Sequence, residues 1–147
     1  MKISIASYSF HGLLGEGQMD IFGYLESCKY RYGLEAADIW NGTLGPGGVD
    51  EAHLRKVRQA LDEREMILAN LCVDGAHLWE DDPGARDKNY RNALAHLKAA
   101  EILGAQTVRI DMGGKGEQLT SEQFDYIVKR YREYAQRAQD QGYRVGP

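Results

Sequence analysis

Apolar and polar positions follow a repeated order along the chain, in which a strand-like run is followed by a helix-like segment. The strand-like runs begin near Lys2, Leu34, Met66, Gln106 and Tyr143, at intervals of roughly 32–40 residues. A segment with helical spacing of apolar residues lies between each consecutive pair. Repeated strand–helix units of this length predict a parallel sheet with right-handed crossovers.

The apolar runs predict four complete strands, and a fifth begins near the end of the chain. The predicted ranges are Lys2–Ser9, Leu34–Trp40, Met66–Val73 and Gln106–Met112, with Tyr143 opening the fifth. The run Met66–Val73 is nearly continuous in apolar residues, as expected for a sheet covered on its faces. The apolar part of the first run, Ile3–Ala6, is too short for a secretory signal and is better explained by a strand.

Four helices are predicted between these strands, each with an apolar stripe and residues typical of helix ends. Thr120 and Gln123 have the spacing of a capping box, and Gly33, Gly104 and Gly142 stand where helices end. The stripes are Phe22, Leu25 and Cys28 in Asp20–Tyr32; Leu54, Val57 and Leu61 after the cap Asp50; Leu94 and Leu97 in Asn89–Leu103; and Phe124, Ile127, Val128, Tyr131, Ala135 and Ala138 after Thr120.

Two architectures fit this alternation: the first half of a (β/α)8 barrel, and a doubly wound sheet of the flavodoxin or response-regulator kind. The doubly wound fold needs a helix after its fifth strand, and none follows Tyr143. It also places its chemistry after strand one, where Ser7–Gly12 has neither an acidic pair nor a phosphate loop. We therefore predict an α/β fold, the first half of a TIM (β/α)8 barrel, as a single domain over residues 1–147 that breaks off in strand five. A sequential strand order would exclude the alternative.

Charge and composition limit the partners. The 18 basic and 22 acidic residues give a net charge of −4 and a pI near 5.6, which disfavours nucleic acid. No stretch approaches 18 apolar residues, so no membrane span is predicted. Cys28 and Cys72 lie in apolar segments and are expected to be buried, reduced thiols. We expect a cytoplasmic protein whose partner is a small molecule.

The candidate chemistry lies where the predicted strands end, because parallel α/β folds place their functional face there. Asp38, Arg109 and Asp111 interrupt apolar strand runs, where an apolar residue would be easier to bury. The structural alternatives are an ion pair between Arg109 and Asp111 and a turn cap by Asp111. Ser9 also ends the first predicted strand, and the strand-end residues assigned to the site are His11, Asp38, Trp40, Asn41, Asp74, His77, Arg109 and Asp111.

Two glycine-rich stretches do not match phosphate-binding motifs. Gly113-Gly114-Lys115-Gly116 lacks the Ser or Thr that follows the lysine of a P-loop, and the glycines of Gly42–Gly48 do not have G-x-G-x-x-G spacing. The stretch Glu80–Pro83 is interpreted as a solvated acidic turn. Trp40 and Trp79 are candidates for the floor of a sugar pocket, with aromatic packing as the alternative.

Four stretches resemble a known family. They are Ile3–Phe10, Tyr32–Trp40 with Asp38 where an acidic residue is usual, Asn92–Asp111 with Ala99–Ala105 leading into Thr107–Ile110, and Ala138–Val145. Together they are similar to the xylose isomerase-like TIM barrels, the sugar phosphate isomerase/epimerase family. The endonuclease IV-like branch has metal-binding histidines after strands three and four, where Asp74 and Asp111 stand here.

The resemblance implies a sugar or sugar phosphate substrate and a divalent metal, Mn²⁺, Mg²⁺, Co²⁺ or Zn²⁺, that stabilises enediolate charge during proton transfer beside a carbonyl. The family's usual metal ligands come from strands five to eight, so no metal ligand is assigned in this chain. The resemblance implies catalytic roles for Asp38, His77 and Arg109. The remaining strand-end residues, His11, Trp40, Asn41, Asp74 and Asp111, are expected to bind substrate.

Three functional hypotheses follow, and the last is a doubly wound domain that binds a small ligand. The first is the amino-terminal half of a metal-dependent sugar isomerase or epimerase, inactive as an isolated half. The second is a non-catalytic half-barrel module, a homo-oligomer or a partner of another chain, because an open sheet has unpaired edges and is expected to have an apolar interior.

Overall fold

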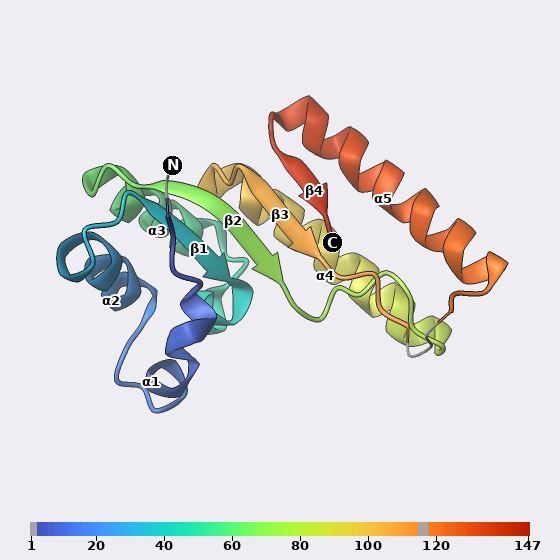
Figure 1. Cartoon of the computed structure of the whole chain (residues 1–147), viewed down its shortest axis with the longest axis horizontal. Coiled ribbons are helices and arrows are strands. Elements are labelled where there is room, and N and C mark those ends of the chain that lie inside the picture. Colours follow the sequence, from blue (N-terminus) through green and yellow to red (C-terminus); the bar gives the residue numbers. More distant parts are fainter. Residues whose placement is uncertain (1–2, 115–117) are drawn as a thin grey trace.

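The computed structural model describes residues 3–114 and 118–147. Lys2, where the first strand was predicted to begin, and Lys115 and Gly116 of the rejected glycine motif lie outside the described residues. Four parallel strands form one sheet in sequential order: β1 (Ala36–Trp40), β2 (Ile67–Val73), β3 (Thr107–Ile110) and β4 (Arg144–Gly146) (Figure 1). This order excludes the doubly wound alternative and is that of the first half of a (β/α)8 barrel.

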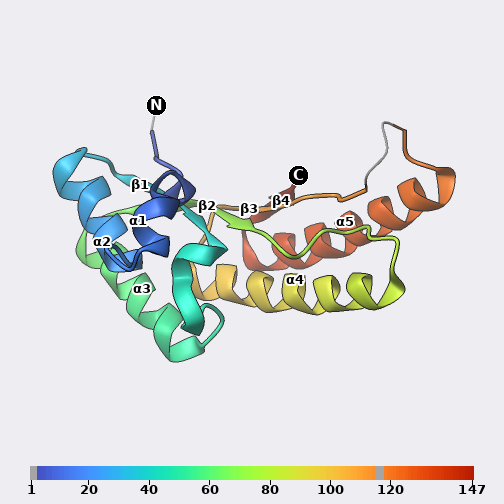
Figure 2. The same ribbon diagram turned by 90° about the horizontal axis from the view of Figure 1, so that it is seen from below.

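The long helices lie on one side of this sheet. These are α3 (Glu51–Glu63), α4 (Pro83–Leu103) and α5 (Ser121–Gln141), and the buried core lies between them and the strands (Figure 2). Before β1 come α1 (His11–Gly15) and α2 (Ile21–Glu26), which continues as a π-helical turn over Ser27–Arg31. Within residues 3–114 and 118–147, no helix is both long and apolar enough to cross a membrane.

Local capping chemistry sets most helix boundaries. Asp20 and Asp50 accept hydrogen bonds from backbone N–H groups of the first turns of α2 and α3, and the Thr120–Gln123 capping box is present at α5. The predicted start of the third helix at Asn89 is wrong. The α4 helix begins at Pro83 because the Asp82 carboxylate caps it, so the acidic residues before Pro83 do not form a simple solvated turn.

The apolar stripe of α5 is rotated from the predicted one. Ile127 and Ala138 are buried as predicted, but Phe124 and Ala135 are exposed and Tyr134 is 1% exposed. The helix packs toward α4, where the Tyr134 ring stacks on Tyr90 at 6.3 Å between ring centroids. Neighbouring-helix contacts therefore decide which side of α5 is buried.

The first predicted strand, Lys2–Ser9, is the main error in the predicted sheet. Among its described residues only Ala6 makes a bridge, to Asp38, and Ser7–Phe10 turn into a 3-10 helix. The Ser7 hydroxyl, not a backbone carbonyl, accepts the Trp40 N–H at 2.8 Å, and it also bonds the Thr43 hydroxyl at 2.6 Å. A side-chain hydrogen bond thus replaces the backbone hydrogen bonds that a strand would make with β1. From Ser7 onward the chain is no longer extended.

The sheet face opposite the long helices carries polar side chains, so the expectation of an apolar interior is wrong. Strand register places Asp38, Asn70, Thr107 and Arg144 side by side in one row. Trp40, Cys72 and Arg109 form the next row toward the strand ends. A bulge at Ala69 of β2 brings Asn70, not Ala69, opposite Asp38. The helix-facing positions between these rows are buried and apolar: Ala37, Ile39, Leu71, Val73, Val108 and Ile110.

Candidate functional site

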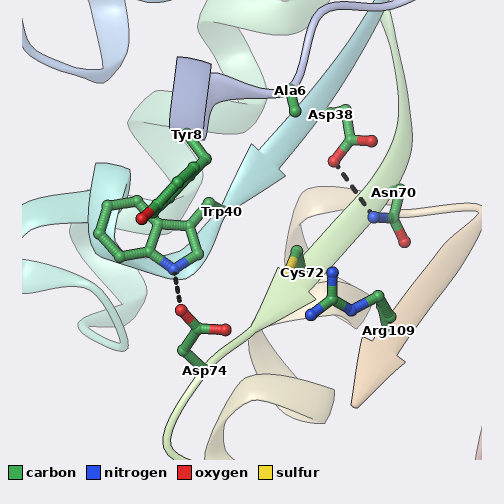
Figure 3. Close-up of a pocket in the computed structure, with 8 residues that line it drawn as sticks. All are labelled: Ala6, Tyr8, Asp38, Trp40, Asn70, Cys72, Asp74 and Arg109. Atoms are coloured by element: carbon green, nitrogen blue, oxygen red, sulfur yellow. Dashed lines mark hydrogen bonds between the residues drawn. The ribbon is translucent and has the colours of Figure 1, made fainter. Parts of the chain in front are cut away.

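A pocket of about 440 Å³ lies on the polar face of the sheet, toward the carboxyl ends of the strands (Figure 3). Both polar rows contribute to its wall, together with the segment before α1. The lining residues are Ala6, Tyr8, Asp38, Trp40, Asn70, Cys72, Asp74 and Arg109. It lies where parallel α/β folds place their ligands.

Asp38 is held through both its backbone and its side chain. At the edge of β1 that faces residues 3–6, the buried Tyr24 hydroxyl accepts the Asp38 N–H at 3.0 Å and donates to the Ile5 carbonyl at 2.6 Å. On the pocket side, the Asn70 amide donates to Asp38 Oδ1 at 3.1 Å (Figure 3). Burial raises the pKa of Tyr24 far above its ordinary value, so this hydroxyl stays protonated. The Asp38 carboxylate therefore has a fixed place in the pocket wall.

Trp40 ends β1 with its ring beside the pocket. Its indole N–H donates to Asp74 Oδ2 at 2.7 Å, and Tyr8 meets it edge-on with ring centroids 5.1 Å apart. A Cβ atom at Gly42 would lie 2.2 Å from the Trp40 ring, so only glycine allows this packing. Trp40, Tyr8 and Asp74 together form an aromatic wall with a carboxylate at its edge.

Asn41 ties the ends of β1 and β2 together. Its side-chain oxygen accepts the Asp74 N–H at 3.1 Å, and its amide donates to the Asp74 carbonyl at 3.1 Å. The same amide lies 3.4 Å from Nε2 of the buried His96, whose Nδ1 faces the Asn92 carbonyl at 3.0 Å. Burial lowers the pKa of His96, which favours the neutral ring with its proton on Nδ1. In this structure Asn41 does not line the pocket and instead places Asp74.

Arg109 supplies the cationic group of the pocket. Its guanidinium donates to Asp111 Oδ2 at 2.8 Å, and that hydrogen bond raises the pKa of Arg109 above its ordinary value. Both side chains are about two-fifths exposed, at 44% and 41%. The ion pair foreseen as a structural alternative is thus present, while Arg109 also lines the pocket and Asp111 does not.

Two predicted histidines, His11 and His77, do not line the pocket. His77 follows β2 and its Nδ1 is 3.2 Å from Glu80, within the loop that Asn89 holds through the His77 carbonyl. His11 begins α1 and stacks on Tyr8 with ring centroids 4.9 Å apart, so it lies behind a pocket residue. Of the eight predicted site residues, four meet at the pocket: Asp38, Trp40, Asp74 and Arg109.

Four lining residues were not predicted: Ala6, Tyr8, Asn70 and Cys72. Asn70 interrupts an apolar run in the middle of a strand, the same signal that singled out Asp38. Cys72 was expected to be buried like Cys28, but it is only partly buried and faces the pocket, where burial raises the pKa of its thiol. No comparable signal marked Tyr8, because the turn at Ser7 decides where it points.

The residues of this site do not fit a metal ion by themselves. In the part of the chain that the structure describes, no three His, Cys, Asp or Glu side chains gather as ligands. The three strand-end carboxylates instead bond separate donors: Asp38 bonds Asn70, Asp74 bonds Trp40 and Asp111 bonds Arg109. A divalent ion usually needs several such oxygens to converge, so no chemical step is derived through a metal here.

Comparison with solved structures identifies the fold. The chain superposes on a protein from Rhodospirillum rubrum assigned as a xylose isomerase, with a TM-score of 0.75 and 11% identity over 97% of this chain and 52% of that one. It superposes on AsbF from Bacillus anthracis, assigned as a 3-DHS dehydratase of petrobactin synthesis, with a TM-score of 0.72 and 16% identity over 99% of this chain and 51% of that one. It also superposes on D-psicose 3-epimerase, in a structure with D-fructose, with a TM-score of 0.71 and 15% identity over 99% of this chain and 51% of that one.

No family model and no curated protein matches the sequence. The chain spans about half the length of each of these three solved structures. At 11–16% identity the likeness concerns the fold alone. The sequential parallel sheet, its single layer of long helices and this coverage agree: the chain has the fold of one half of a TIM barrel.

Proposed function

We propose that this chain supplies the substrate-binding side of a sugar isomerase or epimerase site. The observation that carries the proposal is the pocket itself, which Asp38, Asp74 and Arg109 line together with the Trp40 ring. The solved neighbours carry the names of an isomerase, an epimerase and a dehydratase, so the fold does not choose among reactions. The choice of a sugar rests on the pocket chemistry together with the sequence resemblance.

The pocket matches the two kinds of surface that a sugar presents. Carboxylates such as Asp38 and Asp74 accept hydrogen bonds from hydroxyl groups, and a charged acceptor strengthens each bond. The face of an aromatic ring such as Trp40 packs against the C–H side of a pyranose or an open-chain polyol. About 440 Å³ is within the range of small-molecule sites. The pocket therefore suits one monosaccharide.

Proton transfer beside a carbonyl is the reaction we assign to the whole site. Abstraction of that proton leaves negative charge on the carbonyl oxygen, which a guanidinium such as Arg109 stabilises by charge-assisted hydrogen bonding. Asp38 is the acid–base candidate, because Asn70 occupies only one of its carboxylate oxygens among the described residues. A metal, where the complete site holds one, would supply further stabilisation of that charge. His77 lies outside the pocket lining and has no step in this scheme.

Sugar binding can be tested through the tryptophans. The chain has two, and Trp79→Phe leaves Trp40 as the only indole reporter. We expect D-fructose, D-psicose or their phosphates to change Trp40 emission in this background. Asp38→Asn should raise the Kd at least about tenfold, because a hydrogen bond to a charged group is worth about 1.5–3 kcal/mol. Asp125→Asn, an exposed carboxylate on α5, is the matched control and should leave the Kd within about twofold.

Turnover provides the second test. We expect no aldose–ketose or epimer exchange from this chain alone, even with Mn²⁺ added, since its described side chains gather no metal ligand set. Exchange of the substrate's C–H proton with solvent, followed by NMR, would contradict that expectation. If no sugar or sugar phosphate changes Trp40 emission, the proposed function itself is refuted.

A further inference from the structure

The Asp38 carboxylate ends a chain of hydrogen bonds that crosses three strands. Asn70 on β2 donates to Asp38 Oδ1 at 3.1 Å, and the Thr107 hydroxyl on β3 lies 3.0 Å from Asn70 Oδ1. The same hydroxyl lies 2.8 Å from the Ala69 carbonyl, at the bulge of β2. Thr107 is not among the residues lining the Asp38 pocket, so it reaches the site only through Asn70.

The Asp38 carboxylate and the Thr107 hydroxyl favour the same orientation of the Asn70 amide. A hydroxyl that donates to Asn70 Oδ1 leaves the amide NH₂ pointing at Asp38, where it meets a carboxylate acceptor. The reversed amide would place Oδ1 against an ionised carboxylate, with two acceptors in contact and no proton between them. Without the hydroxyl, the β3 side of Asn70 would no longer favour either orientation.

The relay also has a consistent arrangement when Asp38 holds a proton. The Asp38 hydroxyl then donates to Asn70 Oδ1, the reversed Asn70 amide donates to Thr107 Oγ1, and the Thr107 hydroxyl turns to the Ala69 carbonyl at 2.8 Å. The side chains of Asp38, Asn70 and Thr107 thus keep a partner in both protonation states.

We infer that Thr107 and Asn70 form a positioning relay that orients the Asp38 carboxylate and reverses when Asp38 takes a proton. The inference deepens the proposed function, on which it rests, by giving the acid–base residue a support for both of its forms. The proton involved is the one that Asp38 removes from the sugar carbon. Asp38 holds it until it passes to the neighbouring carbon in an isomerisation, or to solvent in an epimerisation in which another donor protonates the opposite face. Thr107 acts through Asn70 and touches no reacting atom.

The test measures amide orientation directly by NMR of the ¹⁵N-labelled chain. At neutral pH the Asn70 Hδ2 protons should show contacts to the Asp38 side of the strand, and on acidification these contacts should move to Thr107. Ionisable groups that surround Asp38 include Tyr8, Tyr24, Cys72, Asp74 and Arg109, so Asp38→Asn serves to identify the titration that drives the change. In Asp38→Asn the acid-induced reversal should disappear.

Thr107→Val and Thr107→Ser separate the relay from simple packing. Valine keeps the shape and removes the hydroxyl. At neutral pH the ionised Asp38 still holds the amide NH₂, but on acidification the reversed amide has no acceptor on β3, so the orientation in acid should become mixed. The Kd for sugar should rise about fivefold, as for loss of one hydrogen bond. Serine keeps the hydroxyl and should restore both readouts to within about twofold of wild type. A merely structural threonine would change stability without changing the Asn70 orientation.

The relay is overturned if wild-type Asn70 points its amide at Thr107 at neutral pH, or if Thr107→Val matches wild type in orientation and affinity. Should Thr107→Val fail to fold, the wild-type, Asp38→Asn and Thr107→Ser spectra still decide the question. If wild type binds no sugar, the proposed function fails while the amide measurement continues to test the relay.

Discussion

Replacing Tyr24 by phenylalanine tests how the amino-terminal segment is attached to the sheet. The Tyr24 side chain is fully buried, and its hydroxyl links the Ile5 carbonyl at 2.6 Å with the Asp38 N–H at 3.0 Å. The Asp38 carbonyl also lies 3.0 Å away. This single oxygen stands where a strand ladder would otherwise join residues 3–6 to β1, so its removal should affect both the segment and the site.

The cost of Tyr24→Phe can be worked from these contacts. The ring stays packed against Phe10, with ring centroids 5.9 Å apart in wild type, so apolar burial hardly changes. Two hydrogen bonds worth about 1 kcal/mol each are lost, and the Asp38 N–H is left without its partner. We expect a loss of about 2–4 kcal/mol of unfolding free energy. For a chain of this size that corresponds to a fall in Tm of roughly 4–16 °C.

Urea denaturation and amide hydrogen exchange measure the effect. The Asp38 amide should lose protection, since its acceptor is gone. Tyr30→Phe is the matched control, because Tyr30 is 69% exposed and its substitution should cost less than about 0.5 kcal/mol. A cost for Tyr24→Phe below about 1 kcal/mol, or one equal to that of the control, would refute the argument that the phenol replaces the ladder.

Three further predictions concern the site and its supports. Gly42→Ala places a Cβ within 2.2 Å of the Trp40 ring, so Trp40 emission should shift and the bond to Asp74 should break; unchanged emission would contradict this. Burial lowers the pKa of His96 below 6.5, so the folded state disfavours its proton and stability should fall as pH drops below about 6.5, with a shallower fall in His96→Gln. Thr120→Ala should cost about 1 kcal/mol by urea denaturation and Thr120→Ser much less; equal costs would argue against the cap.

The parts of the fold that the sequence predicted well are those determined by local chemistry. Helix ends at Asp50, Gly104 and Gly142 follow from one capping side chain or one left-handed backbone conformation, with φ of 67° at Gly104 and 81° at Gly142. The start of α4 was misplaced because Asp82 was assigned to an acidic turn, although it precedes Pro83 in the usual order of a cap and a first helical residue.

The amino-terminal segment was mispredicted because its bonding partners are distant in sequence. Tyr24 reaches Ile5 across 19 residues and Ser7 reaches Trp40 across 33, and neither contact leaves a periodic signal. Residues 3–9 have the composition of a strand, yet Ser7 and Tyr24 hydroxyls take the places of ladder partners. A pattern of apolar residues does not show whether a segment pairs with its neighbour through backbone hydrogen bonds or through hydrogen bonds from side chains.

Half of the predicted site residues line the pocket because strand ends converge in any parallel sheet. Which other side chains join them depends on the strand register. The bulge at Ala69 sets Asn70 opposite Asp38, and no sequence rule located that bulge. The resemblance pointed to Asp38 and Arg109, which meet at the pocket, and to His77, which the loop after β2 holds elsewhere. Polar interruptions of apolar strands, applied to every strand, would have added Asn70.

The polarity of the open face bears on the alternative that the chain is an assembly module. Asp38, Arg109 and Arg144 occupy this face, so an apolar partner surface laid on it would strip water from several charges. Burying a charge without a partner is unfavourable by about 3–5 kcal/mol, far more than a small apolar contact contributes to binding. A polyol, a water layer or a partner with complementary charges avoids that cost. We therefore expect any self-association to use the strand edges beside β4 and residues 3–6, and to persist when Arg109→Gln removes a charge from the open face.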